Sequence, residues 1–442
     1  MTLTATFLLC ASFLAAGPVV EVEDVVATCR PPNNGAGPLW CYGAPLLIRQ
    51  GEKVIVSVME TGEGVPLLSN TRWRLFERDS KGWSLCRQPD GFRHREPCPV
   101  VRLGPDRFVL SVNPSTEPPG TMYGHCDPHL LRFDSKNPSQ APDVLRPNWP
   151  KSAHFTDHSY RGIAADGRRG EVLLLNIDAS TSSQHWAFCV ADGTFPRMGT
   201  IRFPIRGCYP QVALRDRAAH VLAIGDIVEP VKAWRAFKKQ KTSRDWDYVF
   251  RRLFYTQTPD VARTDFAQPI EVDSADAKGG HISNLDLWID PRGAAHLLYL
   301  KTNLNPLLRD QFFPGQPVVT TLEHVEVKHG KVARRTTLLK GGEKARVTCQ
   351  YARFHVTEDG ALWVVDRVSG SRPDGSSLQE NQVFRVRDGK MDGKPVSLAL
   401  KTPFSTFFTN AERGGNEPSN VLDLFGVAGD GETLRYARVR MR

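Results

Sequence analysis

The sequence predicts an all-β fold, a seven-bladed β-propeller with four antiparallel strands per blade. Three observations lead to this prediction: a turn-rich composition, a repeated two-strand unit, and further strand-like segments between the repeats. The 442 residues include 36 glycines and 32 prolines, which suits a β chain with many turns better than a helical one. The alternatives are a multi-sheet sandwich, two separate β domains, or a ring of six or eight blades.

The two-strand unit recurs along most of the chain. Each copy has a few polar residues, an apolar strand, a turn carrying Asp or Gly, and a second apolar strand. Seven copies begin, in chain order, at Ala44, Pro99, Tyr160, Pro210, Asn284, Ala352 and Asn420. One such sheet cannot bury both of its faces, whereas a ring of sheets buries both and leaves only short edges exposed.

Segments between the copies supply the outer strands of each blade. The stretches "TRWRLFERDSKGWSLCR", "LEHVEVKHGKVARRTTLL" and "NQVFRVRDGKMDGKPVSLAL" have the pattern of outer hairpins, and "RRLFYTQTPD" that of an outer strand. Asp-Gly pairs at 192–193, 359–360, 388–389 and 430–431 provide the residues that tight hairpin turns require. Each unit therefore has room for four strands.

Two segments fall outside the regular pattern. The seventh copy lacks an outer strand, and "VVEVEDVVA" (19–27) can complete its sheet and close the ring. The irregular insertion Glu229 to Arg252 is expected to be a short helix or a basic loop over one face.

The first residues have the pattern of a secretory signal. "TLTATFLLCASFLAAG" is an apolar run that ends in small residues, and it is too short for a confident transmembrane helix, which needs about 20 apolar residues. We expect residues 1–17 to be a signal peptide and 18–442 a single propeller domain. The mature chain would be secreted or periplasmic and would have no integral membrane segment; the alternative is a buried N-terminal segment.

Cysteine usage agrees with an oxidising compartment. Nine cysteines become eight when Cys10 leaves with the signal, and an even number is typical of disulfides. The plausible short-range pairs are Cys29 with Cys41, Cys86 with Cys98, and Cys189 with Cys208. Because no CxxC spacing occurs, we expect no structural zinc site. No P-loop, HExxH or calcium-loop motif occurs either, and we expect no cofactor. The stretch Glu271 to Gly280 is only a weak candidate for cation binding.

The net charge of +9 favours a polyanionic partner. Nucleic acid, an acidic glycan or polysaccharide, and an anionic membrane face are the candidates, and for a secreted chain we expect the acidic glycan or polysaccharide. The segment Trp234 to Arg252 is the one stretch that mixes dense basic and aromatic residues, but nucleic acid is not expected as a ligand outside the cell.

Polar and aromatic residues precede the inner strand of most copies, and in a propeller these positions meet at one central mouth. The expected catalytic residues are His158, Tyr160, Tyr209 and His281. The expected substrate-binding residues are Arg161, Arg206, Arg353, Tyr351, Asn284 and Trp40. The seventh copy would add Asn416, Glu417 and Asn420.

These residue types suit recognition of a sugar acid. Three arginines from three units would hold a carboxylate or sulfate through paired hydrogen bonds. A neighbouring His or Tyr could remove or donate a proton, and Trp40 could stack on a sugar ring. The plain alternative is that the arginines are surface charges and that Tyr209 and Tyr351 are core aromatics.

At "DHSYRGIAAD", "IDPRGAAHLLYL" and "VTEDGALWVVD" the chain resembles the sialidase-like propellers with bacterial neuraminidase (BNR) repeats, which include some polysaccharide lyases. The resemblance implies an enzyme of lyase or hydrolase type that acts on an acidic polysaccharide. Lyases of this architecture are implied to use His, Tyr and Arg on a uronic acid, which His158, Tyr160, Arg161, Arg206 and Tyr209 match in type. Only a degenerate Asp box, "RDSKGWS", is present and no Arg-Ile-Pro motif, so sialic-acid cleavage is not expected. The alternative is a non-catalytic propeller that binds a glycan or a protein.

Overall fold

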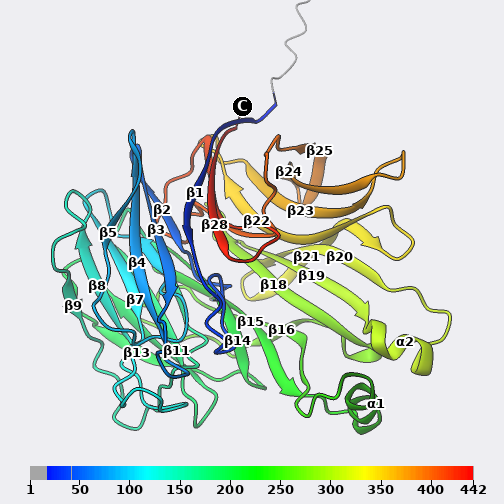
Figure 1. The fold of residues 1–442 in the computed structure, drawn as a ribbon, viewed down its shortest axis with the longest axis horizontal. Coiled ribbons are helices and arrows are strands. Elements are labelled where there is room, and N and C mark those ends of the chain that lie inside the picture. Colours follow the sequence, from blue (N-terminus) through cyan, green and yellow to red (C-terminus); the bar gives the residue numbers. More distant parts are fainter. Residues whose placement is uncertain (1–16, 41, 442) are drawn as a thin grey trace, which may run out of the picture.

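The chain forms seven four-stranded antiparallel sheets arranged as the blades of a propeller (Figure 1). The computed structural model describes residues 17–40 and 42–441. The expected signal peptide lies almost entirely outside these residues. The first strands of neighbouring blades contact one another around the central axis, which makes them the inner strands. The fold class predicted from the repeats is confirmed.

The first four blades follow the order of the chain. Blade 1 contains β2 (Leu47–Gln50), β3 (Lys53–Thr61), β4 (Thr71–Asp79) and β5 (Gly82–Arg87). Blade 2 contains β6 (Val100–Arg102), β7 (Arg107–Val112), β8 (His129–Asp134) and β9 (Asp143–Leu145). Blade 3 contains β10 (Gly162–Asp166), β11 (Glu171–Ile177), β12 (Gln184–Cys189) and β13 (Arg197–Ile201). Blade 4 contains β14 (Gly207–Arg215), β15 (Ala218–Val228), β16 (Tyr248–Thr258) and β17 (Ile270–Ser274).

The last three blades include the one that joins the two ends of the chain. Blade 5 contains β18 (Gly279–Ile289), β19 (Ala295–Leu304), β20 (Val319–Lys328) and β21 (Lys331–Gly342). Blade 6 contains β22 (Val347–Val356), β23 (Leu362–Ser371), β24 (Ser377–Arg387) and β25 (Lys390–Ser397). Blade 7 contains β26 (Thr406–Thr409), β27 (Val421–Val427), β28 (Thr433–Arg440) and the N-terminal strand β1 (Val19–Thr28).

Burial follows the position of a strand in its blade. Strand β11 is buried at every residue, because both faces of this inner part of the blade pack against neighbouring blades. The outer strand β25 is mostly exposed. Between β24 and β25 the turn residues Asp388 and Gly389 have φ of 50° and 74°, the left-handed pair that a tight two-residue hairpin turn requires.

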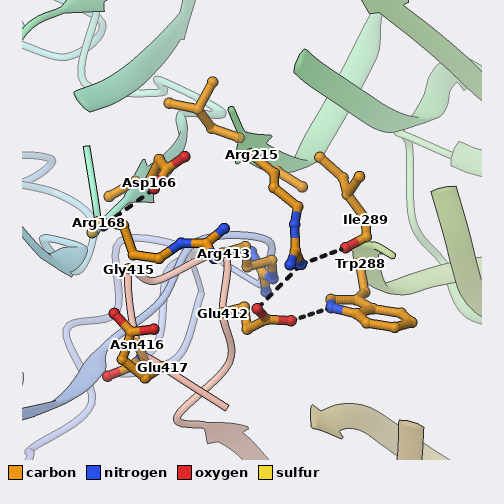
Figure 2. A pocket seen from close by; sticks show the side chains of 14 residues that line it. Asp166, Arg168, Arg215, Trp288, Ile289, Glu412, Arg413, Gly415, Asn416 and Glu417 are labelled. Carbon is orange, nitrogen blue, oxygen red and sulfur yellow. Dashed lines mark hydrogen bonds and ion pairs between the residues drawn. The ribbon is translucent and has the colours of Figure 1, made fainter. Parts of the chain in front are cut away.

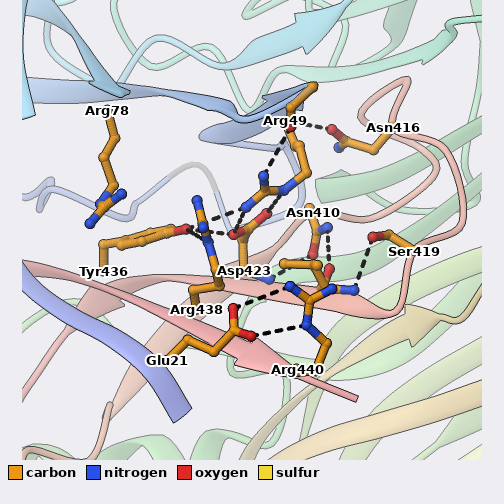
Figure 3. A network of polar contacts seen from close by, with 12 residues as sticks. Glu21, Arg49, Arg78, Asn410, Asn416, Ser419, Asp423, Tyr436, Arg438 and Arg440 are labelled. Atoms are coloured by element: carbon orange, nitrogen blue, oxygen red, sulfur yellow. Dashed lines mark hydrogen bonds and ion pairs between the residues drawn. The ribbon is translucent and has the colours of Figure 1, made fainter. Parts of the chain in front are cut away.

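The ring closes through β1, which pairs antiparallel with β28 from Val19↔Arg440 to Thr28↔Thr433. Polar contacts across this junction tie blade 7 to blade 1 (Figure 3). Arg49 of β2 donates to the buried carboxylate of Asp423 at 2.6 Å, and the Tyr436 hydroxyl donates to the same carboxylate at 2.6 Å. Arg440 forms an ion pair with Glu21 of β1 at 3.0 Å.

The seventh sequence copy is displaced by one strand from its expected place. The segment from Asn420 forms β27 and β28, whereas the inner strand of blade 7 is the short β26. Asn416 and Glu417 therefore lie in the loop after an inner strand instead of before one. The expectation that Asn416, Glu417 and Asn420 face the mouth was wrong, because "TFFT" of β26 is too short to show a strand period in the sequence.

The expected disulfides are not formed where the structure describes both partners. Cys86 and Cys98 are free thiols, and so are Cys189 and Cys208. Cys29 is also a free thiol, and its expected partner Cys41 lies outside the described residues. The members of both described pairs belong to different blades or flanks of blades, so short separation in sequence did not bring their side chains together.

Among residues 17–40 and 42–441, two helices interrupt the strand pattern, and they lie next to each other at one edge of the molecule (Figure 1). Helix α1 (Lys232–Thr242) joins β15 to β16, within the expected insertion, and helix α2 (Pro306–Phe312) joins β19 to β20. Rings of Trp234 and Phe237 in α1 pack against Phe312 at centroid distances of 6.4 Å and 5.5 Å. A single 3₁₀ turn, η1 (Asp276–Lys278), precedes β18. Within the described part of the chain, no helix is long and apolar enough to cross a membrane.

Candidate functional site at the propeller mouth

A cavity of about 350 Å³ opens where the inner strands of blades 4, 5 and 6 begin. We call this end of the ring the mouth. The cavity is lined by aromatic residues and by uncharged or weakly basic polar residues, and Arg353 lies at its floor. The aromatic residues are Trp40, Tyr42, Tyr209, Phe250 and Tyr351. The polar residues are His281, Ser283, Asn284, Gln350 and Thr406.

Irregularities in three adjacent inner strands direct side chains into this cavity. The pairing register shifts between Cys208 and Gln211 in β14, between Asn284 and Asp286 in β18, and between Cys349 and Tyr351 in β22. A bulge bends a strand and re-aims the side chain at that point. Tyr209 also has a φ of 47°, a strained left-handed conformation for a non-glycine residue that is typical of functional sites.

The aromatic side chains form a continuous arc of touching rings. The Tyr209 ring contacts those of Trp40, Tyr42 and Phe250 at centroid distances of 5.8, 5.3 and 5.9 Å. Phe250 in turn contacts the His281 ring at 6.0 Å. Mutual edge-to-face packing holds such rings in place, so the arc is a preformed apolar wall.

His281 and Tyr209 have opposite protonation preferences at this wall. The His281 ring is surrounded by protein on most sides, which lowers its pKa with help from the Arg251 charge, yet it remains reachable from the cavity. Its Nε2 lies 3.2 Å from the Ser283 Oγ. Burial raises the pKa of the Tyr209 hydroxyl. At neutral pH the histidine is therefore free to accept a proton and the tyrosine has one to donate.

The cavity floor is fixed and positively charged. All five N–H donors of Arg353 are used, on the carbonyls of Tyr42, Leu285 and Phe407, on the Gln211 side chain and on the Tyr351 hydroxyl. Below it, the buried Arg413 pairs with Asp286 at 2.7 Å. Two guanidinium groups and one carboxylate leave one net positive charge, which favours an anionic ligand.

Beside the cavity, the Tyr209 ring contacts that of Tyr160 at 4.8 Å. The Tyr160 hydroxyl donates to the buried Asp226 carboxylate at 3.0 Å, and Arg206 donates to the same oxygen at 2.5 Å. The His158 ring lies 4.2 Å from that of Tyr160. Burial raises the pKa of Tyr160 and lowers that of His158. Tyr160 thus keeps its proton in the hydrogen bond to Asp226, and His158 stays neutral at neutral pH.

The three arginines expected to form one clamp do not converge. Arg353 is saturated in the floor, and Arg206 lies at the rim with about a third of its side chain exposed (32%). Arg161 is buried between blades 2 and 3, where it donates to the carbonyls of Ser111 and Glu96 at 3.0 and 3.3 Å. The guanidinium groups of Arg161 and Arg353 therefore donate to backbone carbonyls between the blades.

Of the ten site residues predicted from sequence, six line the cavity: Trp40, Tyr209, His281, Asn284, Tyr351 and Arg353. His158, Tyr160 and Arg206 form the adjoining cluster, and Arg161 is turned away. Sequence reasoning missed Phe250 and Asp226, which lie inside strands and carry no positional signal. Gln350, which belongs with Tyr351 to the polar residues at the start of the sixth copy, also lines the cavity.

At the opposite end of the axis, the loop between β26 and β27 packs against the inner strands, and its Arg413 and Gly414 carbonyls accept from the Ala165 and Arg102 amides at 3.0 and 2.8 Å. There the ends of β10, β14 and β18 meet the loop between β26 and β27 around a hollow of about 30 Å³ (Figure 2), room for one or two water molecules. Glu412 accepts from Arg215 at 3.3 Å and from the Trp288 indole. Asn416 and Glu417 lie at this end.

Among the described residues, no group of three His, Cys, Asp or Glu side chains is placed to hold an ion. In the weak candidate stretch Glu271 to Gly280, the Asp273 carboxylate instead accepts from Lys301 at 2.8 Å and from Tyr299 at 2.7 Å.

No protein-family model and no curated protein matches the chain, but many solved structures do. A polysaccharide lyase, Uly1, is 11% identical with a TM-score of 0.49, covering 90% of each chain. The α-L-arabinofuranosidase Arb93A of Fusarium graminearum is 12% identical with a TM-score of 0.38, covering 77% of this chain and 91% of its own. A puromycin-hydrolysing peptidase of Mycobacterium tuberculosis is 12% identical with a TM-score of 0.45, covering 87% of this chain and 48% of its own. Proteins with such different activities are alike in fold alone, and the resemblance to BNR-repeat sialidases stays a prediction.

Proposed function

We propose that the mouth binds an acidic polysaccharide and cleaves it by elimination, as a polysaccharide lyase. The observation that carries the proposal is the lining of the cavity. It combines a rigid aromatic wall, a neutral histidine and a protonated tyrosine over a positively charged floor. Aromatic faces stack on sugar rings, amides such as Asn284 and Gln350 bond sugar hydroxyls, and the floor attracts a uronate.

Hydrolysis is the less suitable chemistry for this cavity. Glycoside hydrolysis ordinarily uses two carboxyl groups on opposite sides of the scissile bond. The cavity is lined by no Asp or Glu among the described residues. Elimination next to a carboxylate needs only a base, an acid and stabilisation of negative charge, and the cavity offers candidates for each.

In the proposed reaction, the His281 imidazole removes the proton from the carbon next to the uronate carboxylate. That electron pair forms a carbon–carbon double bond, and the glycosidic carbon–oxygen bond at the adjacent carbon breaks. The Tyr209 hydroxyl gives its proton to the leaving oxygen. The positive charge of Arg353 and Arg413 stabilises the carboxylate as negative charge accumulates on it. Transfer of the proton from His281 to Tyr209 through solvent restores both groups.

The test is incubation with alginate, polygalacturonate, hyaluronan and chondroitin sulfate while the ultraviolet absorbance of an unsaturated uronate is followed. His281→Ala and Tyr209→Phe should each lower kcat by about a hundredfold or more on the accepted polymer. Because burial lowers the pKa of His281, the acid limb of the rate profile should lie below the pH at which an exposed histidine titrates. The matched control is His329→Asn, on an exposed hairpin turn of blade 5 where φ is 48° and asparagine is tolerated.

The second candidate function is a propeller that binds an acidic glycan without cleaving it. The hydrogen bonds of the arginines favour it, because Arg353 uses all its donors within the protein and Arg206 donates to Asp226. Titration calorimetry with the same polymers separates the two. Tight binding without any new absorbance, unaffected by His281→Ala, would remove the lyase proposal and leave the binding module.

A further inference from the structure

A row of adjoining hollows, which we call the groove, leads from the mouth cavity toward helix α1. A second hollow, of about 370 Å³, shares Phe250 and His281 with the mouth cavity. A third, of about 180 Å³, shares Lys238, Asp247 and Tyr248 with the second. The shared lining residues place the three hollows next to one another, over blades 4 and 5 and between the segments that carry α1 and α2.

The outer end of the groove carries exposed aromatic rings. Trp246 and Tyr248 are 65% and 42% exposed, and their ring centroids are 6.2 Å apart. The Arg206 guanidinium lies 5.1 Å from the Tyr248 ring and 5.8 Å from the Tyr160 ring. Arg206 thus connects the outer aromatic pair to the cluster beside the mouth. Large apolar rings exposed along a groove are typical of a binding surface.

The surroundings of the outer groove are basic. Helix α1 has five basic residues and no acidic residue, and four of the five are exposed: Lys232, Arg235, Lys239 and Lys241. Exposed Arg244 follows the helix. The two carboxylates nearby are each paired with a lysine, Asp247 with Lys238 at 2.6 Å and Asp245 with Lys239 at 2.5 Å, which leaves Lys232, Arg235, Lys241 and Arg244 in excess. The excess of positive charge is complementary to a polyanion.

Helix α1, which forms one wall of the groove, is anchored to the blade beneath it. Buried Glu229 accepts from Lys238 of α1 at 2.9 Å and from Arg251 of β16 at 3.0 Å. The Trp234 ring lies 5.4 Å from the Arg251 guanidinium and packs against α2. The helix is therefore tied to the blade beneath it, and its position does not depend on a ligand.

We propose that this groove is an extended subsite that holds a linear, negatively charged polysaccharide along its length. Trp246 and Tyr248 stack on sugar units outside the mouth cavity, while Arg244, and Lys239 when it exchanges its ion pair with Asp245, pair with the acid groups. The proposed substrates are therefore long chains of an acidic polysaccharide. This inference rests on the proposed function, since it takes the mouth as the place where the inner end of the chain lies.

The experiment compares binding of a disaccharide and a long oligomer of the polymer selected from alginate, polygalacturonate, hyaluronan and chondroitin sulfate. The wild type should bind the long oligomer more tightly than the disaccharide. Trp246→Ala should weaken the long oligomer about tenfold and leave the disaccharide unchanged. Trp246→Phe, which keeps a flat ring, should restore most of the affinity.

The charge contribution has its own variant pair. Lys239→Gln with Arg244→Gln should lower the affinity for the long oligomer and flatten its dependence on salt, because fewer counterions are exchanged. Lys390→Gln with Lys394→Gln removes two exposed charges from blade 6 instead and should change neither quantity.

The outcomes separate this inference from the proposed function. Equal affinity for short and long oligomers, or an unchanged affinity in Trp246→Ala, overturns the groove and leaves the mouth proposal standing. Length-dependent binding that Trp246→Ala abolishes and His281→Ala does not affect supports the groove even when no polymer is cleaved. Failure of every oligomer and polymer to bind overturns both.

Discussion

Asp366 in β23 is fully buried inside blade 6. Burial raises the pKa of its carboxyl group to about 8, and the Glu380 charge acts in the same direction. An unfolded chain would release this proton near pH 4. Between about pH 4 and about pH 8 the folded protein therefore binds one proton more than the unfolded chain, and folding stability falls as pH rises through this window.

Asp366→Asn should remove this dependence. The amide occupies nearly the same volume and carries no charge, so the variant should be more stable than the wild type near neutral pH. The wild-type free energy of unfolding should fall by up to about 1.4 kcal/mol per pH unit across the window, and the variant should show a flatter slope. Denaturant titrations at several pH values measure both. Asp388→Asn, on the exposed β24–β25 turn, is the control, and equal slopes in Asp366→Asn and wild type would contradict the assignment.

At the scale of an element, helix α1 depends on its anchors more than on its own sequence. No side chain caps its N-terminus, its first turn has no acidic residue, and its exposed face carries like charges. Each of these features weakens an isolated helix, and eleven residues are too few for stability in water without tertiary contacts. The helix is therefore held by Glu229, Lys238 and Arg251 and by packing on α2.

Glu229→Ala should release α1 while the blades stay folded. Two buried cations would lose a shared partner, which costs about 3–5 kcal/mol in comparable buried pairs. Amide hydrogen exchange over 232–242 should become faster, and trypsin should cleave at the lysines of the helix. Asp245→Asn removes a pair with Lys239 in which both side chains are mostly exposed (61% and 82%), and it should leave exchange unchanged. Protection of α1 that survives Glu229→Ala would show that aromatic packing alone holds it.

At the scale of the whole molecule, the sequence predicts the ring better than it predicts the site. Strand alternation and Asp-Gly turns are local patterns, and seven repeats of them leave few arrangements other than a propeller. The direction of a side chain at the mouth is not local. It depends on a bulge such as that beside Tyr209, and on distant partners such as the Ser111 carbonyl that captures Arg161. Six of the ten predicted residues line the cavity. A position before an inner strand brings a residue to the mouth, but its side chain must also point into the cavity, and that direction is not a local pattern.

Ring closure is the property on which every mouth contact depends. Strand β1 supplies the outer strand of blade 7, and Arg78 of β4 pairs with Asp24 of β1 at 2.7 Å. Residues from blades 4, 5, 6 and 7 and from the segment after β1 line one cavity, so its lining depends on ring closure. Without β1, the edge of β28 would be exposed to pairing with other chains.

Deletion of residues 17–28 should therefore lower the apparent Tm by at least about 5 °C and promote aggregation. A synthetic peptide of residues 17–30 should raise the Tm again as its concentration increases, because it binds the folded ring and not the unfolded chain. Glu21→Gln removes only the partly exposed ion pair with Arg440 and should shift the Tm by little. This variant separates the effect of strand pairing on the Tm from the effect of the ion pair. A truncated chain that melts at the wild-type temperature, with or without the peptide, would mean that six complete blades and a three-stranded seventh close the ring unaided. In that case β1 would serve chiefly to position Trp40 and Tyr42, and the loss would appear in ligand binding while the Tm stayed constant.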